Sequence, residues 1–365
     1  MAIRSLMASV LRKRSDETFG RAFMRDDYWQ QVRGVAIIAV VMIHATSAAQ
    51  NIAGSSENIL EIIILRQFIN FAVPLFLCIS GYFATNYKNR SILKYYFDRS
   101  SRIIYPYIFW TILYIFTFHF DKIHNIKFII LMIATGSGIF IGYFIIVLLQ
   151  MILITPIIYS LKRNKHIITL IIFTFIGLFY TYYINIEQQN SWISRFPYNG
   201  LPFFVWYPFY HLGVYIKSCE DENRTVNLKP KALLISWVAA VGLSITEAVI
   251  LMKYGISSMS FSQVKFSSFL ASTFLFLYFV AFYQQNKPKI KFKFVSYLGN
   301  ISFFVYFFHL IPLILLERIF KEIHINIYSY IMIIVLSVLT LGSCCIAANL
   351  GGYLPNTIKK RLLGL

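Results

Sequence analysis

The stretch GVAIIAVVMIHATSAAQNI, residues 34–52, decides the fold of this chain. It contains no Asp, Glu, Lys or Arg. As an α-helix it would extend about 28 Å, close to the ~30 Å of hydrocarbon in a bilayer. The stretch therefore predicts a membrane-spanning helix, with one histidine, His44, inside the span.

Apolar runs of similar length recur along all 365 residues. Hydrophobic residues make up 58% of the chain and charged residues 13%, with a mean hydropathy of +0.64. Soluble domains carry about 25% charged residues, and their cores stop growing near ~250–300 residues. The composition excludes a soluble enzyme, a secreted domain and a disordered chain. Further spans are predicted at 61–86, 101–120, 139–160, 166–184, 201–217, 231–252, 264–284, 295–317 and 327–349, with the short run 125–137 re-entrant or interfacial.

The charge of +19 follows the predicted loops in alternation. Basic residues gather in the N-terminal segment, in the even-numbered loops and in the tail, whereas the odd-numbered loops are nearly bare. Lys and Arg collect in cytoplasmic loops of membrane proteins, so this pattern indicates topology rather than nucleic-acid binding. It predicts an all-α bundle of about ten transmembrane helices with both termini cytoplasmic. The chain divides into a basic segment (1–30), a transmembrane domain (31–350) and a cytoplasmic tail (351–365).

Arg33 and His44 lie eleven residues apart in the first span. That spacing places them about 16 Å apart along a helix and on nearly the same side of it. Taken alone, Arg33 reads as a topology charge, and the alternative to a functional His44 is a hydrogen-bonded packing histidine. Ionisable residues inside a membrane are costly and usually functional, so we interpret His44 as a functional histidine. No cysteine spacing resembles a zinc or disulfide framework, and no metal site is predicted.

Two further polar groups stand out in the apolar spans. Arg99 and Arg102 share a helix face at the start of the third span, a geometry that suits a phosphate group or, equally, lipid headgroups. Ser302, Tyr306 and His309 share one face of the ninth span, which favours a polar cavity. A buried acidic residue in the seventh span, Glu247, needs a partner, either in that cavity or in a structural pair with Arg66 or a histidine.

These residues, taken in order, resemble the acyltransferase-3 family of bacterial membrane O-acyltransferases. The resemblance begins with the Arg33–His44 spacing and continues through most of the chain. It is carried further by VPLFLCISGYF at 73–83, RSSRIIYPYIFW at 99–110, GYFIIVLLQMILITPII at 142–158 and YLGNISFFVYFFHLIP at 297–312. The similarity extends to the branch that acetylates or succinylates surface or secreted polysaccharides.

The resemblance implies transfer of an acyl group, most often acetyl, from cytoplasmic acyl-CoA to a sugar hydroxyl of a polysaccharide or its undecaprenyl-linked precursor. Carried over by position, His44 is the expected base, and Arg33, Arg99 and Arg102 are expected to hold the donor phosphates. Ser302, Tyr306, His309 and Glu247 are expected on the acceptor side or along the cavity. The implied location is the bacterial inner membrane, with acetyl-CoA as co-substrate and no bound cofactor.

A multi-span transporter or flippase of a glycan or lipid-linked intermediate is the alternative. It would share the span count and the buried histidines, but it is expected to show paired broken helices in two related halves. The sequence has no such repeat. It leaves the acyl group, the glycan and the formation of a homo-oligomer open.

Overall fold

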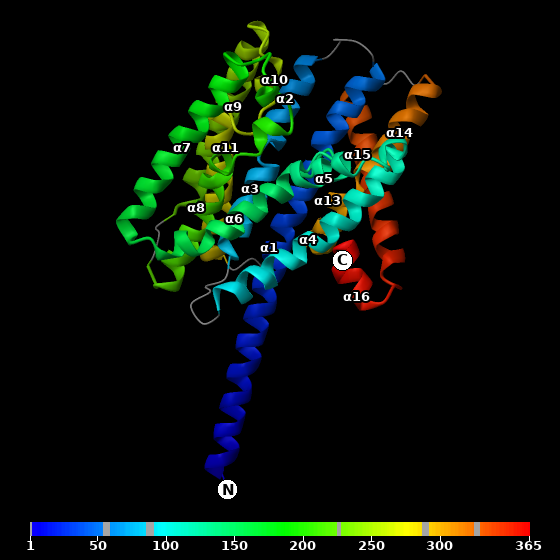
Figure 1. Cartoon of the computed structure of the whole chain (residues 1–365). Helices are drawn as coiled ribbons and strands as arrows, with labels where there is room; N and C mark the ends of the chain where they lie inside the picture. The colour runs from blue at the N-terminus through cyan, green and yellow to red at the C-terminus, as the bar shows by residue number, and fades with distance from the viewer. Residues whose placement is uncertain (1, 54–58, 85–90, 225–227, 287–291, 325–328) are drawn as a thin grey trace.

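The computed structural model describes residues 2–53, 59–84, 91–224, 228–286, 292–324 and 329–365, with side chains described from residue 27 onward. Within these residues the chain is helical, without strands. The helices of seven or more residues (Figure 1) are α1 (Ala2–Ala53), α2 (Ile59–Ile69), α3 (Ala72–Tyr82), α4 (Ile92–Phe118), α5 (Ile126–Thr135), α6 (Tyr143–Ser160), α7 (Arg163–Ile186), α8 (Phe203–Asp221), α9 (Pro230–Lys253), α11 (Phe266–Asn286), α12 (Lys293–Asn300), α13 (Ser302–Phe308), α14 (Leu310–Glu322) and α15 (Ser329–Gly351).

Eight helical segments among the described residues are long and apolar enough to cross a membrane. They are Asp27–Ala53 of α1, Ile59–Tyr82 across α2 and α3, α4, α6, α7, α9, Phe266–Gln285 of α11, and α15. A ninth forms if α13 and α14, which meet at 44°, act as one broken span. The all-helical prediction is confirmed, and these segments fit an integral membrane protein. The predicted span 201–217 is the helix α8, which is not among the eight, so ten spans and cytoplasmic termini stay predictions.

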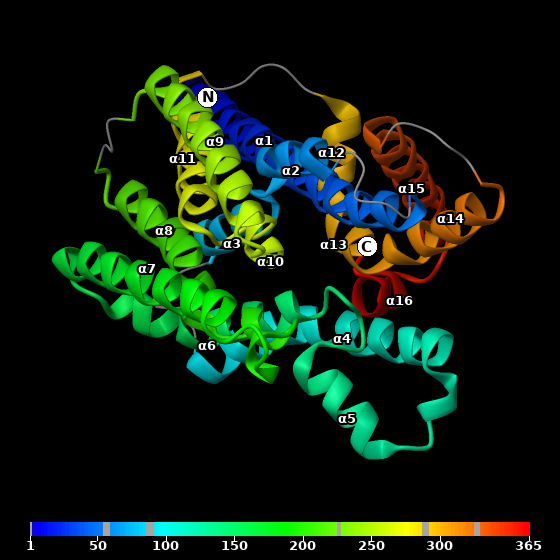
Figure 2. The same cartoon turned by 90° about the horizontal axis from the view of Figure 1, so that it is seen from above.

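Helix α1 joins the two halves of the bundle. It packs against α2 and α3 on one side and against α12 to α15 on the other. The view from above shows α7, α8, α9 and α11 on one flank and α13 to α15 on the opposite flank, with α1 and α2 between them (Figure 2). The N-terminal part of α1 continues as one helix beyond the bundle (Figure 1).

Two glycines bring α3 and α8 into backbone contact. A Cβ on Gly81 would lie 2.0 Å from the carbonyl oxygen of Tyr210, and one on Gly213 would lie 2.0 Å from that of Cys78. Small residues permit such close approach between membrane helices. The glycine of the ISGYF segment is therefore a packing residue, and it fixes the end of α3 against α8.

The predicted re-entrant run 125–137 contains the short helix α5. Asn125 caps it by accepting a hydrogen bond from the amide of Phe128 at 3.1 Å, and no residue of α5 is buried. The helix packs on α4 at the edge of the bundle (Figure 2). After it, the chain turns at Gly136, whose φ of 73° suits glycine, and leads to Phe140, which lies between the buried Ile139 and Ile141.

Candidate active site

A cavity of about 400 Å³ lies beside the half of α1 that follows His44. Its walls also come from α2, α3, the 139–144 segment, α13 and the loops around residues 196–199 and 258–263. It therefore lies toward the end of the bundle opposite Arg33. The lining residues are Val40, Ile43, His44, Thr46, Ser47, Gln50, Arg66, Val73, Phe76, Phe140, Ile141, Tyr143, Phe144, Phe196, Asn199, Ser258, Phe261, Gln263 and Tyr306.

The lining combines aromatic rings with amide and hydroxyl groups. Phe140 and Phe196 lie with ring centroids 4.9 Å apart and planes tilted by 34°, and Tyr143 meets Phe196 edge-on at 5.1 Å. Asn199 and Gln263 add amide groups to the cavity lining. An apolar surface with a few convergent polar groups is typical of a small-molecule or sugar site.

His44 lines this cavity with a half-buried imidazole. Its ring meets Phe140 edge-on, with centroids 6.1 Å apart. On its other side the ring centroid of His309 lies 5.2 Å away. His44 is thus held between an aromatic wall of the cavity and a second, fully buried histidine.

His309 sits at the 44° break between α13 and α14 and is fully buried. Its Nδ1 lies 2.8 Å from the carbonyl oxygen of Val305 and 2.9 Å from that of Tyr306, so Nδ1 must be the protonated, donating nitrogen. Nε2 then carries a lone pair, and it is buried without a hydrogen-bond partner among the described residues. A neutral acceptor nitrogen therefore lies beside His44.

Tyr306 and Ser302, predicted with His309 on one face, are placed differently. Tyr306 lines the cavity, and its hydroxyl donates to the carbonyl oxygen of Ile141. Ser302 is the first residue of α13, is half-buried and is not among the cavity-lining residues. The bond from Tyr306 to Ile141 ties α13 to the segment that brings Phe140 into the cavity.

Arg66 is a cavity residue that the sequence indicated only as a partner for Glu247. Its side chain on α2 is 8% exposed. Nη1 donates to the carbonyl oxygen of Ile43 at 3.2 Å, Nη2 donates to that of Phe261 at 3.0 Å, and the guanidinium lies 5.7 Å from the Phe261 ring. An arginine inside the apolar run 61–86 was the available signal, since intramembrane cations are costly.

Arg33 and Arg99 meet at Phe83, the residue that ends the ISGYF segment. The guanidinium of Arg33 lies 5.4 Å from the Phe83 ring, and Nη2 of Arg99 donates to the Phe83 carbonyl oxygen at 3.1 Å. Arg33 also donates to Oε1 of Gln30 at 3.4 Å. The third predicted cation, Arg102, is exposed on the next turn of α4. Two guanidiniums from α1 and α4 therefore converge at the end of α3.

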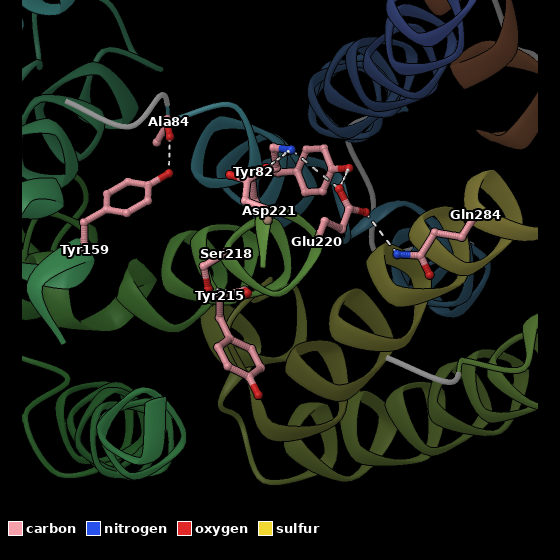
Figure 3. Close-up of polar contacts among 9 residues, drawn as sticks. Tyr82, Ala84, Tyr159, Tyr215, Ser218, Glu220, Asp221 and Gln284 are labelled. Carbon is pink, nitrogen blue, oxygen red and sulfur yellow. Dashed lines mark hydrogen bonds and ion pairs between the residues drawn. The ribbon is translucent and has the colours of Figure 1, made fainter. Parts of the chain in front are cut away.

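A polar cluster lies next to Phe83 and fixes this end of the bundle (Figure 3). Glu220 of α8 accepts from the Tyr82 hydroxyl at 2.5 Å and from Nε2 of Gln284 at 3.0 Å. The Tyr159 hydroxyl donates to the carbonyl oxygen of Ala84. These contacts join α3, α6, α8 and α11 around the place where Arg33 and Arg99 converge.

Glu247 belongs to a buried network rather than to the cavity wall. Its carboxylate accepts hydrogen bonds from the Tyr182 hydroxyl and from the amide and hydroxyl of Ser267. Beside it the fully buried Lys265 donates to Oε1 of Gln67 at 2.8 Å and to serine hydroxyls of α9 and α11. The network ties α2, α7, α9 and α11 together.

Two other histidines form a buried pair that the sequence did not indicate. Nδ1 of His166 lies 2.8 Å from Nε2 of His211, between α7 and α8. Neither histidine lines the cavity. Within the described residues, no group of three or more His, Cys, Asp or Glu is placed to hold a metal ion.

Comparisons with known proteins show what the chain is similar to. The sequence model of a family described as "Acyltransferase domain" matches residues 26–349. A probable poly-beta-1,6-N-acetyl-D-glucosamine export protein of Staphylococcus aureus strain Mu50 is 23% identical over 325 residues, covering 87% of this chain and 88% of that protein. The protein of the same name from strain MRSA252 is 22% identical over 331 residues. No solved structure gives a significant match.

Proposed function

The chain belongs to the acyltransferase-3 family, and from that premise we propose that it transfers an acyl group from cytoplasmic acyl-CoA to a hydroxyl of a polysaccharide. We propose acetyl as the acyl group. The acceptor is a surface or secreted glycan or its undecaprenyl-linked precursor, and the enzyme resides in the bacterial inner membrane. Similarity to proteins named for a poly-N-acetylglucosamine supports a glycan acceptor.

The observation that carries the proposal is the placement of two predicted site residues, Arg33 and His44, along the same helix, α1. This helix presents Arg33 beside Arg99 at one end of the bundle and His44 about 16 Å further along, where the cavity begins. An acyl-CoA has phosphates at one end of a long flexible arm and a thioester at the other. The arrangement supports a donor that lies along α1, with its phosphates near Arg33, Arg99 and Arg102 and its thioester near His44.

His44 is the proposed general base. The acceptor hydroxyl attacks the thioester carbonyl while His44 takes its proton, and the proton then passes to the departing thiolate of coenzyme A. His309 acts as a positioning residue: its free Nε2 can accept the N–H of one His44 nitrogen, which leaves the other His44 nitrogen to take the substrate proton. No resident cofactor is needed for this route.

The acceptor is proposed to occupy the cavity on the side of Tyr306. Phe140 and Phe196 offer ring faces for a sugar, and Asn199 and Gln263 offer amide groups for its hydroxyls. Ser302 and Glu247 lie outside the cavity lining, so a role for them on the acceptor side would act through neighbouring helices.

The test uses the full-length protein in proteoliposomes with radiolabelled acetyl-CoA and polysaccharide extracts. Wild-type protein is expected to release or transfer the label, and His44→Ala is expected to lose at least about 100-fold in rate. Exposed His124, replaced by Ala, serves as the matched histidine control. Absence of turnover of any acyl-CoA in the presence of acceptor extracts would contradict the proposal.

Export of a glycan is the second candidate function, because both relatives carry export in their names. It differs from acyl transfer in what moves. Proteoliposomes loaded with poly-N-acetylglucosamine oligomers would release them without acyl-CoA, and His44→Ala would leave that release intact. Acyl-CoA-dependent labelling of the oligomers without their movement would favour the acyltransferase.

A further inference from the structure

Arg66 is a buried cation held rigidly at the level of His44. Its Nη1 donates to the carbonyl oxygen of Ile43, the residue that precedes His44, and Nη2 donates to that of Phe261. Because both bonds are to backbone oxygens, the guanidinium plane is fixed between α1 and the segment that contains Phe261. Nε is buried and has no hydrogen-bond partner among the described residues.

No carboxylate among the described residues balances this charge at the cavity wall. Arg66 lines both the 400 Å³ cavity and an adjoining one of about 190 Å³, and neither is lined by Asp or Glu. The carboxylate expected as its partner, Glu247, is bonded to Tyr182 and Ser267. A buried cation without a counter-charge is costly, so the site is built to receive negative charge from what it binds.

We propose that Arg66 is a catalytic residue that binds the thioester oxygen as it becomes negatively charged. As the acceptor oxygen forms a bond to the thioester carbon, the carbonyl π electrons move onto oxygen beside the guanidinium. When that oxyanion collapses, the C–S bond breaks and coenzyme A leaves as the thiol with the proton carried by His44. This role rests on the proposed acyl transfer.

Position favours the oxyanion over an acidic group on the acceptor. The Arg66–Ile43 bond places the guanidinium next to the residue that bears the base, which is where charge develops in the reaction. The glycan named for the relatives is a polymer of N-acetylglucosamine, a neutral sugar. Pre-positioned donors at a developing oxyanion are typically worth about 10²–10³ in kcat.

The experiment compares Arg66→Gln and Arg66→Lys in the full-length protein, with Arg195→Gln as control. Arg195 is an exposed cation in the 187–202 loop and leaves the cavity lining unchanged. Three quantities are measured: the Kd of acetyl-CoA, its hydrolysis without acceptor, and transfer to neutral N-acetylglucosamine oligomers. Folding of each variant is checked by thermal unfolding. In a separate rescue assay, guanidinium chloride at millimolar concentration is added to Arg66→Ala.

The proposal expects Arg66→Gln to lower kcat for hydrolysis and for transfer alike by about 10²–10³, with Kd changed less than about twofold. Added guanidinium is expected to restore part of the rate to Arg66→Ala. Unchanged hydrolysis with a raised KM for acceptor would overturn it in favour of an anion-binding acceptor site. A folded Arg66→Gln with wild-type kcat would overturn it outright. If the wild-type protein shows no turnover, the proposed acyl transfer itself is contradicted, and this result is distinguishable from a failure of the Arg66 proposal because it needs no Arg66 variant.

Discussion

His44 and His309 lie with their ring centroids 5.2 Å apart, although they come from α1 and from the junction of α13 and α14, 265 residues later in the chain. His309 stands between the two helices, where the chain bends by 44°. Because Nδ1 of His309 bonds to backbone carbonyl oxygens, Nε2 is the ring nitrogen that remains available to a partner. The pair therefore combines the proposed base, which lines the cavity, with a fully buried histidine beside it.

His309→Ala is expected to lower kcat by about 10- to 100-fold, because hydrogen bonds to a group that becomes charged are worth about 1.5–3 kcal/mol. His309→Gln keeps an acceptor oxygen near the position of Nε2 and is expected to retain more activity than His309→Ala. KM for acyl-CoA should change little in either variant. Steady-state kinetics in proteoliposomes check both values, and equal activity of Ala, Gln and wild type would contradict the positioning role.

The convergence of Arg33 and Arg99 on Phe83 predicts coupling between the two cations. Arg33→Gln and Arg99→Gln are each expected to raise KM for acetyl-CoA about tenfold or more with little change in kcat. Because both contact one residue, the double variant should depart from additivity by more than about 0.5 kcal/mol. Initial rates over a range of acetyl-CoA concentrations provide the measurement.

Acetyl-pantetheine, which lacks the nucleotide phosphates, serves as the control substrate. Wild type and both arginine variants should use it with the same KM, since the proposed contacts that the variants lose are to phosphate. If the variants lose as much activity with acetyl-pantetheine as with acetyl-CoA, the arginines act on the fold of α1, α3 and α4 rather than on the donor. Arg102→Gln, on the exposed turn of α4, should shift KM in the same direction.

The sequence predicted the fold well wherever hydrophobicity alone decides it. Nine of the ten predicted spans fall on candidate membrane helices or on the bent pair, because continuous apolar runs need no partner to be recognised. The remaining predicted span is α8, which carries Lys217 and Glu220 near one end. It packs closely against α3 through Gly213 and its neighbours. Packing of that kind depends on residues far apart in the chain.

The site was predictable along one helix but not between helices. The spacing of Arg33 and His44 can be derived from 3.6 residues per turn. The contacts of Arg66 with Ile43 and Phe261 cannot, because they depend on how α2 meets α1 and a distant loop. For the same reason Glu247 could be recognised as needing a partner, whereas the identity of that partner required the structure.

We expect Glu247→Gln to lower the thermal stability of the protein more than it lowers kcat. The change removes the charge that accepts hydrogen bonds from Tyr182 and Ser267, at a cost of about 1–3 kcal/mol for buried partners left poorly satisfied. Thermal unfolding in detergent measures the loss, with exposed Glu187→Gln as the matched control. A stable Glu247→Gln that has lost its kcat would instead favour a direct role on the acceptor side.

The predicted sidedness can be tested at two polar turns. Lys162, between α6 and α7, is expected in the cytoplasm, and exposed Trp192, between α7 and α8, is expected outside. A membrane-impermeant thiol reagent added to intact cells should label Trp192→Cys and leave Lys162→Cys unlabelled until the cells are opened. The native cysteines, three of them buried, set the background. The reverse labelling pattern would invert the donor and acceptor sides.

Gly81→Ala is expected to prevent close packing of α3 on α8. The added Cβ would lie 2.0 Å from the carbonyl oxygen of Tyr210, which is backbone and cannot move aside as a side chain can. Because Phe83 follows two residues later, a displaced α3 also carries away the residue on which Arg33 and Arg99 converge. The variant should therefore give less folded protein and, in the fraction that folds, bind acetyl-CoA more weakly.

Gly242→Ala is the control, since nothing lies within 4 Å of a Cβ there, and it should leave both properties unchanged. If Gly81→Ala matches Gly242→Ala in yield and in Kd, the helices can separate without cost, and the close packing of α3 on α8 does not determine the donor site.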